Sequence, residues 1–284
     1  MRLVFVHGIA QQGRDPSELK KIWLEALEKG LARAGLGSIG QHEVIFPFYG
    51  DKLAEFTAQL ETPGSVQWQS KGMEAMPQLD GIEAELLQEI LAPQLASAAK
   101  HQGVMTKGLQ NTSLALALAR AADSSPFGAH LLAHFVKEVS AYLTHRRVMQ
   151  RIDEIVQTAI GTERCVVIGH SLGSVVAFRI LREMGGAANV EMFITLGSPL
   201  GLNTIRNFIT PPPLQNPAGV KSWINAYDPT DVVSLHPLDQ STWNVNPPIV
   251  NIPDVRNYTP NRHGISGYLD DRQVAAAVYE ALNR

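Results

Sequence analysis

The chain has 284 residues, of which 45% are hydrophobic and 18% charged, and its formal net charge at pH 7 is −3. This length and composition fit a globular protein with a substantial core. The small negative charge argues against a nucleic-acid partner, because proteins that bind nucleic acid usually carry a basic patch or a high isoelectric point.

The opening of the chain predicts a βαβ unit. Residues 3–6 are a continuous apolar run, typical of a strand that is buried on both faces. Residues 16–34 carry apolar side chains at helical spacing, and we expect Gly30 and Gly35 to mark the end of this helix. A second short strand is predicted over 43–48.

Residues 50–143 contain no convincing strand and are rich in alanine, glutamine, leucine and methionine. Helices are predicted over 82–99, 112–122 and 129–142. One side of the first is apolar and carries Leu86, Leu87, Ile90, Leu91 and Leu95. Because the strand pattern resumes afterwards, we expect a helical cap at about 50–143, inserted into a single domain that spans 1–284.

Two interpretations of this cap stay open. Leucine and alanine stripes at helical spacing usually pack inward, which favours a fixed cap. The alternative is a mobile lid whose apolar stripe meets lipid, which would bring a peripheral membrane contact. In both cases we expect the cap over the carboxyl edge of the strands, where folds of this class bind ligands.

Strands and helices alternate in the rest of the chain. Strands are predicted over 164–168, 190–196, 220–226 and 248–252, and helices over 148–160, 172–184, 203–209 and 271–282. This alternation predicts the α/β class, with a doubly wound and mostly parallel sheet of about six strands.

Cysteine content and hydropathy bear on the compartment. The single cysteine, Cys165, excludes an internal disulfide and lies in an apolar run where we expect a buried, inert thiol. The N-terminal apolar run is too short for a signal peptide, and no apolar stretch reaches the roughly 18 residues of a membrane span. We therefore expect a cytoplasmic protein with no transmembrane segment.

The strongest motif is Gly169-His170-Ser171-Leu172-Gly173, which follows a predicted buried strand and precedes a predicted helix. In this context Gly-x-Ser-x-Gly is typical of a nucleophile elbow, a strained turn that lifts the serine hydroxyl above the sheet edge. Side chains at 169 and 173 would collide with neighbouring backbone. We predict Ser171 as the nucleophile.

With this motif the chain resembles the α/β-hydrolase superfamily, specifically its lipase and esterase branches. The resemblance covers residues 2–49 and about 145–284, and leaves out the insertion. It implies the α/β-hydrolase fold, a triad in the order Ser, Asp, His, and a backbone oxyanion hole. Such a triad requires no metal and no organic cofactor.

His7-Gly8 after the first strand is the second signal, because the resemblance implies a loop here that supplies one oxyanion donor. Carried over, this donor is the N–H of Ile9 or, alternatively, of Ala10. The second donor is the N–H of Leu172, the residue after the nucleophile. We expect His7 to shape the loop rather than carry a proton.

Two aspartates compete for the acid in the turn after the strand over 220–226. An Asp-x-Val phrase followed shortly by Pro237 resembles the acid loop of secreted lipases and points to Asp231. Asp228 is the alternative acid. If Asp231 is the acid, we expect Asp228 to cap the turn through its side chain.

The base is expected after the last strand. His263-Gly264 lies on a polar loop there, with Tyr268 a few residues on, as in the base loop of the same lipase-like proteins. His236 is the rival, but it precedes Pro237 and lies too close to the acid loop. The segment 197–199, Gly-Ser-Pro, also resembles these enzymes and is predicted to shape the floor beside the serine.

These motifs predict a serine hydrolase that cleaves a carboxylic ester, with a small-molecule or lipid substrate, through an acyl-enzyme. An interfacial lipase or phospholipase is the nearest alternative, and a non-catalytic binding module of the same fold is a third. A dinucleotide-binding protein is disfavoured, because the residues after the first strand fail the Gly-x-Gly-x-x-Gly spacing.

Overall fold

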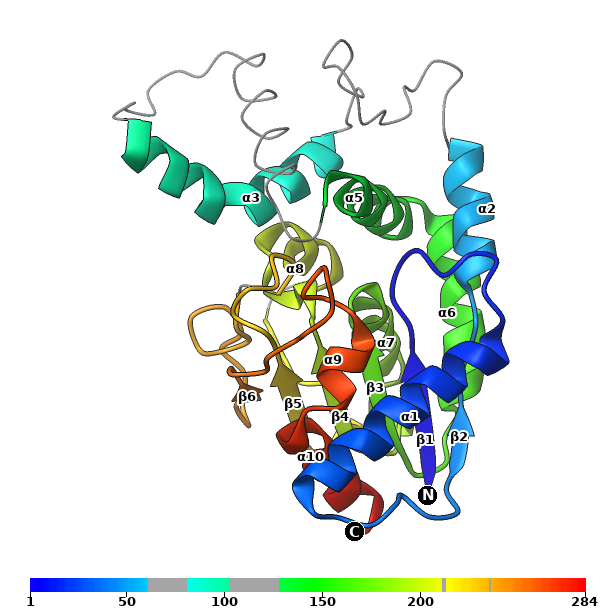
Figure 1. Cartoon of the computed structure of the whole chain (residues 1–284). Helices are drawn as coiled ribbons and strands as arrows, with labels where there is room; N and C mark the ends of the chain where they lie inside the picture. The colour runs from blue at the N-terminus through cyan, green and yellow to red at the C-terminus, as the bar shows by residue number, and fades with distance from the viewer. Residues whose placement is uncertain (61–80, 103–127, 211–212, 235) are drawn as a thin grey trace.

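A computed structural model describes residues 1–60, 81–102, 128–210, 213–234 and 236–284. In this part of the chain six parallel strands form one sheet in the order β2-β1-β3-β4-β5-β6 (Figure 1). The strands are β1 (Arg2–Val6), β2 (Glu43–Ile45), β3 (Cys165–His170), β4 (Val190–Leu196), β5 (Trp223–Ala226) and β6 (Val250–Ile252).

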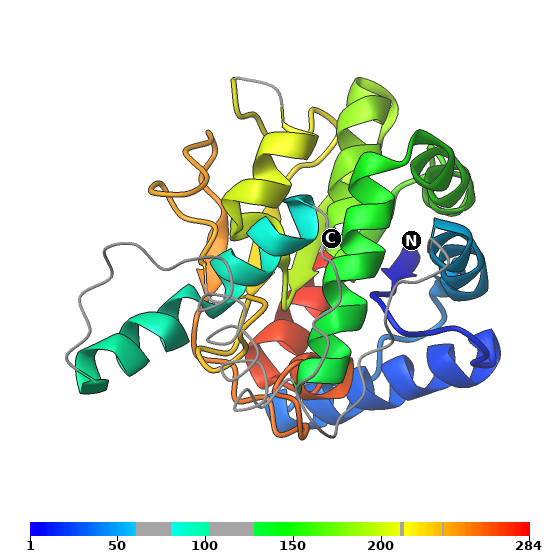
Figure 2. The ribbon, with the colours of Figure 1, turned by 90° about the horizontal axis from the view of Figure 1, so that it is seen from above.

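Helices cover both faces of the sheet. One face carries α1 (Pro16–Ala34) and α10 (Arg272–Leu282), and the other carries α6 (Arg146–Ile160) and α7 (Leu172–Met184) (Figure 2). Alternate residues of β1 belong to different cores, since Leu3 packs on the α1 side and Val4 on the α7 side. The predicted α/β class, with a parallel sheet covered on both faces, is confirmed.

Local signals account for the ends of α1. The Asp15 side chain accepts a hydrogen bond from the Ser17 N–H, Pro16 is the first helical residue, and Gly35 ends the helix in the left-handed region at φ 71°. The expectation for Gly30 is wrong, because it lies inside the helix. A Cβ there would fall 2.5 Å from the backbone oxygen of Leu269, so this glycine permits close packing of α1 against a short helix near the C-terminus.

That short helix is α9 (Ile265–Leu269), which the sequence did not predict. The predicted boundaries of α7, α8 (Asn203–Ile209) and β4 agree with the structure. The described residues of this half also form two short 3₁₀ helices, η1 (Gly185–Ala187) and η2 (Pro199–Gly201).

Three strands are shorter than predicted. The strand predicted over 43–48 ends before Pro47, which lacks the N–H that a ladder needs. Of the residues predicted before β5, Val220 forms only an isolated bridge with Val190. The last strand likewise begins at Val250, after Pro248.

Three described helices lie within the predicted insertion: α2 (Gly50–Leu60), α3 (Gly81–Gln102) and α5 (Ala129–Thr144). In Figure 1, α3 and α5 lie above the sheet, on the side toward which the strands run. The predicted apolar side of α3 is buried in the same core as β1 and β3, through Leu86, Leu87, Ile90 and Leu91. The Leu95 side chain and the helix predicted over 112–122 lie outside what the structure describes. No helix within the described ranges is both long and apolar enough to cross a bilayer.

Candidate active site

The elbow between β3 and α7 holds Ser171 in a strained conformation. Its φ of 53° and ψ of −130° lie in a region that residues other than glycine rarely adopt. The Ser171 N–H donates to the carbonyl of Leu196 on β4 at 3.1 Å, and its own carbonyl accepts from the Ser174 hydroxyl at 2.6 Å. Hydrogen bonds on both sides of the serine therefore hold the turn.

Both glycines of the elbow lie against backbone. A Cβ at Gly169 would fall 2.7 Å from Cα of Ser174, and a Cβ at Gly173 would fall 2.2 Å from the carbonyl oxygen of Val6. A side chain at either position would therefore collide with backbone, as the sequence predicts. Because both residues are glycines, the first turn of α7 can approach the end of β1.

The Ser171 hydroxyl is buried, with 1% of the residue exposed. Its Oγ has no hydrogen-bond partner among the described residues. Most buried side-chain oxygens in proteins are hydrogen-bonded, so an exception needs an explanation. A hydroxyl that reacts with a ligand would be one such explanation.

Asp231 and His263 form a buried pair, in which His263 Nδ1 lies 2.6 Å from Asp231 Oδ2. Asp231 is also fixed by the Val233 N–H, at 3.0 Å from Oδ1, and by the Tyr268 hydroxyl, at 2.6 Å from Oδ2. Burial, with the charge of Asp231 added, raises the pKa of Tyr268 well above its usual value. The tyrosine therefore stays protonated and donates to the carboxylate.

His263 lies beside the elbow because His170, the residue before the nucleophile, holds its backbone. His170 Nε2 is 2.7 Å from the carbonyl oxygen of His263, and the two ring centroids are 4.8 Å apart. Burial lowers the pKa of His170 well below its usual value, and His263 adds to the effect. His170 is therefore neutral, with its proton on Nε2.

The structure pairs Asp231 and not Asp228 with His263. Asp228 Oδ1 accepts from the N–H and the hydroxyl of Thr230, both at 2.6 Å, and Oδ2 accepts from the Asn257 N–H at 2.7 Å. It thus caps its own turn and ties that turn to the loop carrying His263.

The alternative base, His236, packs closely against the segment around Gly201. A Cβ at Gly201 would fall 2.3 Å from the backbone oxygen of His236, so the two segments pack backbone to backbone. Among the described residues, His236 forms no ion pair with an acidic side chain.

The predicted oxyanion loop lies against the nucleophile. A Cβ at Gly8 would fall 2.7 Å from Cβ of Ser171. His7 shapes this loop, because its Nδ1 is 2.8 Å from the Gly8 carbonyl and its Nε2 accepts from the Tyr49 N–H at 3.1 Å. Burial lowers the pKa of His7 to about 4, so the ring is neutral and carries its proton on Nδ1.

The structure separates the alternative oxyanion donors. The Ala10 N–H donates to Glu138 Oε2 on α5 at 3.1 Å. The Ile9 N–H has no partner among the described residues. Leu172 is the first residue of α7, where helix geometry leaves the N–H without an intrahelical acceptor. Of the predicted oxyanion donors, the N–H groups of Ile9 and Leu172 are thus the two without such an acceptor.

The segment after β4 lies against the acid candidate and the elbow. A Cβ at Gly197, which has φ 54°, would fall 3.1 Å from Asp231 Oδ2. The Ser198 hydroxyl lies 2.7 Å from that of Ser174, which in turn holds the elbow. The segment is thus close to the serine, and its predicted role in shaping the floor of the site stays a prediction.

Glu138 and Tyr49 are neighbours of the site that no motif in the sequence marks. The available signal for Glu138 was an acidic residue among the buried apolar side chains of one helix, between Phe135, Val136 and Val139. A carboxyl group in such a position costs free energy unless hydrogen bonds compensate.

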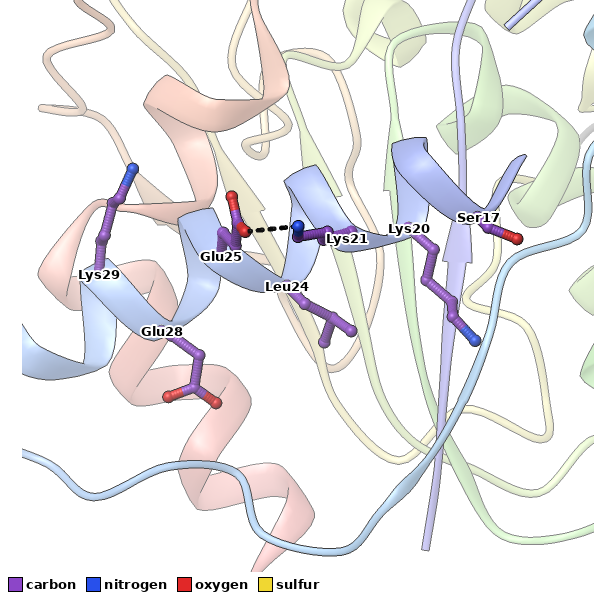
Figure 3. Close-up of a pocket in the computed structure, with 7 residues that line it drawn as sticks. All are labelled: Ser17, Lys20, Lys21, Leu24, Glu25, Glu28 and Lys29. Atoms are coloured by element: carbon purple, nitrogen blue, oxygen red, sulfur yellow. Dashed lines mark ion pairs between the residues drawn. The ribbon is translucent and has the colours of Figure 1, made fainter. Parts of the chain in front are cut away.

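An open groove of about 390 Å³ lies along the outer side of α1 and carries none of these residues (Figure 3). It is lined by Ser17, Lys20, Lys21, Leu24, Glu25, Glu28 and Lys29, with an ion pair between Lys21 and Glu25. Within the described ranges, no group of three histidine, cysteine, aspartate or glutamate residues could hold a metal ion.

No protein-family model, curated protein or solved structure matches this chain at a significant level.

Proposed function

We propose that this protein is a serine hydrolase of the α/β-hydrolase type that cleaves a carboxylic ester through an acyl-enzyme. One observation carries the proposal. A buried Asp231–His263 pair at 2.6 Å lies beside a strained strand–helix turn whose serine hydroxyl is buried without a partner among the described residues. This combination matches the roles of nucleophile, base and orienting acid.

In the proposed reaction Ser171 Oγ attacks the ester carbonyl and loses its proton to His263. Nδ1 of the ring is hydrogen-bonded to Asp231, so Nε2 is the atom that receives the proton. The carboxylate then stabilises the imidazolium and keeps it oriented. The hydrogen bonds from Val233 and Tyr268 hold the carboxylate for this task.

Negative charge develops on the carbonyl oxygen during attack. The N–H groups of Ile9 and Leu172 are the proposed donors to this oxygen, and the N-terminal end of α7 adds its positive dipole. Fixed donors of this kind act on the transition state more than on the substrate, so they raise kcat.

Collapse of the tetrahedral intermediate breaks the ester C–O bond, and His263 returns the proton to the leaving alcohol. Water then attacks the acyl-enzyme carbonyl and gives its proton to the same ring. A second collapse breaks the bond to Ser171 Oγ, which takes the proton back, and releases the carboxylic acid.

Burial of Ser171 favours a second candidate, an interfacial lipase or phospholipase. With 1% of Ser171 exposed, a substrate reaches the hydroxyl only after the covering residues move. In an interfacial enzyme, contact with a lipid surface drives such an opening. Hydrolysis of p-nitrophenyl esters of increasing chain length, with and without micelles, separates the two: a soluble esterase prefers short chains, and an interfacial enzyme is activated by micelles.

The proposal is tested at the nucleophile. Wild-type protein is expected to hydrolyse a short p-nitrophenyl ester and to be labelled by a fluorophosphonate at Ser171. Ser171→Ala is expected to lose both, with kcat falling on the order of 10⁴-fold or more. Circular dichroism checks that the fold is kept. Full activity in the alanine variant would falsify the assignment, and absence of labelling and hydrolysis in the wild type would favour a binding module.

A further inference from the structure

In the loop after β1, side chains hold one backbone group at each of the consecutive residues Gly8, Ile9 and Ala10. Within the loop itself, His7 Nδ1 donates to the Gly8 carbonyl and Gln11 Nε2 donates to the Ile9 carbonyl, each at 2.8 Å. The peptide between Gly8 and Ile9 is planar and trans, so its N–H points away from the carbonyl that His7 holds. The Ile9 N–H is thereby oriented by its own neighbours.

The third contact comes from the insertion. Glu138 on α5 accepts the Ala10 N–H through Oε2, across 128 positions of sequence. Ala10 has φ 57°, a left-handed conformation that costs free energy for a residue with a Cβ. Such a conformation persists only where surrounding contacts hold it. The Glu138 contact lies one residue from the proposed oxyanion donor.

We propose that Glu138 is a positioning residue of the oxyanion hole, which binds the Ala10 N–H and so keeps the neighbouring Ile9 N–H as the donor. The inference rests on the proposed hydrolase function. Because Glu138 belongs to α5, this role would mean that the insertion contributes a residue that positions the catalytic site.

The surroundings of Glu138 support a role beyond helix packing. Its helix is already anchored by the fully buried side chains of Leu132, Phe135, Val136 and Val139. Only 4% of Glu138 is exposed. A carboxyl group in this place is costly without a partner, and the Ala10 N–H is the partner found.

The acceptor does not need to be charged. Burial raises the pKa of Glu138 to about 7, while the hydrogen bond from Ala10 opposes the shift. Close to neutral pH a large fraction of the protein therefore carries a neutral carboxyl group, whose carbonyl oxygen still accepts an N–H. A glutamine offers the same carbonyl oxygen, and a methionine of similar length offers none of comparable strength.

This difference defines the experiment. Glu138→Met and Glu138→Gln are compared with wild type by kcat and KM for a short p-nitrophenyl ester, normalised to sites labelled to completion by a fluorophosphonate. Glu138→Met is expected to lower kcat by about 10- to 100-fold with KM changed by less than about twofold, because the oxyanion exists only in the transition state. Glu138→Gln is expected to keep most of kcat.

A matched control removes another contact between the insertion and the rest of the protein. Glu89 on α3 accepts the N–H groups of Asn203 and Thr204 at the start of α8, at 2.6 and 3.1 Å. Glu89→Gln and Glu89→Met are expected to leave kcat per labelled site unchanged. A loss in the Glu89 variants equal to that in Glu138→Met would overturn the proposal, because general loosening of the insertion would then explain both.

Two further outcomes are decisive. Wild-type kcat per labelled site in Glu138→Met would refute the positioning role, and it would leave the hydrolase proposal intact as long as Ser171→Ala is inactive. An equal loss in Glu138→Gln and Glu138→Met would also refute it, since the acceptor would not matter. If wild type neither hydrolyses the ester nor is labelled, the proposed function fails and this inference fails with it.

Discussion

Ser171, Asp231 and His263 are polar residues with 4% or less of their surface exposed, a placement that costs free energy unless hydrogen bonds compensate. Both carboxylate oxygens of Asp231 accept hydrogen bonds, which come from the ring of His263, the Val233 N–H and the Tyr268 hydroxyl. Each bond also restricts the carboxylate to one orientation. At the scale of single residues, stability and orientation of the ring thus have the same source.

The two aspartates of the turn allow a matched test. Asp231→Asn is expected to lower kcat on the order of 10³- to 10⁴-fold, because the amide no longer fixes the ring of His263 in one tautomer. Asp228→Asn weakens bonds to Thr230 and Asn257 and is expected to lower the free energy of unfolding by about 1–3 kcal/mol. Its kcat per labelled site is expected to stay near wild type.

Steady-state kinetics and urea denaturation of both asparagine variants check this prediction. An inactive, stably folded Asp228→Asn beside an active Asp231→Asn would reverse the assignment of the acid.

The two histidines after the nucleophile give a second comparison. His263→Ala is expected to remove nearly all turnover, since no other group described here is paired with Asp231 as a proton acceptor. His236→Ala is expected to keep it, because His236 packs by its backbone against Gly201. Ester hydrolysis by both variants, normalised to folded protein, is the measurement. Loss of turnover only in His236→Ala would move the base to the other loop.

At the scale of elements, the position of α7 depends on how closely its first turn approaches β1. A Cβ at Gly173 would fall 2.2 Å from the Val6 carbonyl oxygen and 2.3 Å from that of His7. These oxygens belong to the strand end that leads into the oxyanion loop. Contact between α7 and β1 therefore fixes the distance between the nucleophile and that loop.

Gly173→Ala is expected to lower the free energy of unfolding by about 1–3 kcal/mol, because α7 and β1 must move apart. The same movement is expected to lower kcat. Gly186→Ala is the matched control, since a Cβ at Gly186 meets nothing within 4 Å, and it is expected to be neutral or slightly stabilising. Urea denaturation compares the two variants, and equal stabilities would show that the contact at Gly173 relaxes without cost.

Element boundaries differ in how locally they are determined. The α1 helix begins and ends where its own residues direct it, at Asp15 and Gly35. Strands β5 and β6 begin later than predicted, and α9 was not predicted at all. A strand extends only where a neighbouring strand offers hydrogen bonds, so its length depends on the partner as well as on its own residues.

At the scale of the whole molecule, the buried carboxyl group of Glu138 joins α5 to the loop after β1, and its pKa couples stability to pH. The pKa of Glu138 rises from 4.5 to about 7 through burial. Between these values the folded protein keeps a proton that the unfolded chain has released. The free energy of unfolding contributed by this group therefore falls as pH rises from about 4.5 to 7.

Glu138→Gln is expected to remove this dependence. Between pH 5 and pH 8, wild type is expected to lose up to roughly 3 kcal/mol of unfolding free energy relative to the glutamine variant, from the size of the pKa shift. Groups that do not interact with Glu138 cancel in the comparison, and Tyr49, which does interact with it, has a raised pKa and stays protonated over this range. Urea denaturation of both proteins at the two pH values is the measurement, and parallel pH profiles would mean that Glu138 titrates alike in the folded and unfolded states.

The sequence by itself determined the features that depend on neighbours along the chain. Continuous apolar runs predicted strands buried on both faces, their alternation with helices predicted the parallel sheet, and Gly169 and Gly173 marked the turn around Ser171. The order of the nucleophile, acid and base candidates could also be read directly. Each of these signals lies within a few residues, where steric and hydrogen-bonding rules act without knowledge of the fold.

Only the tertiary structure decided which of the alternative residues contact one another. Asp231 and Asp228 lie three positions apart with the same chemistry, and folding pairs one with His263 and the other with Thr230 and Asn257. The Ala10 N–H is engaged by Glu138, a residue 128 positions away that no local pattern connects to it. Contacts of this range depend on how the strands and the insertion pack, and that packing is a property of the assembled core.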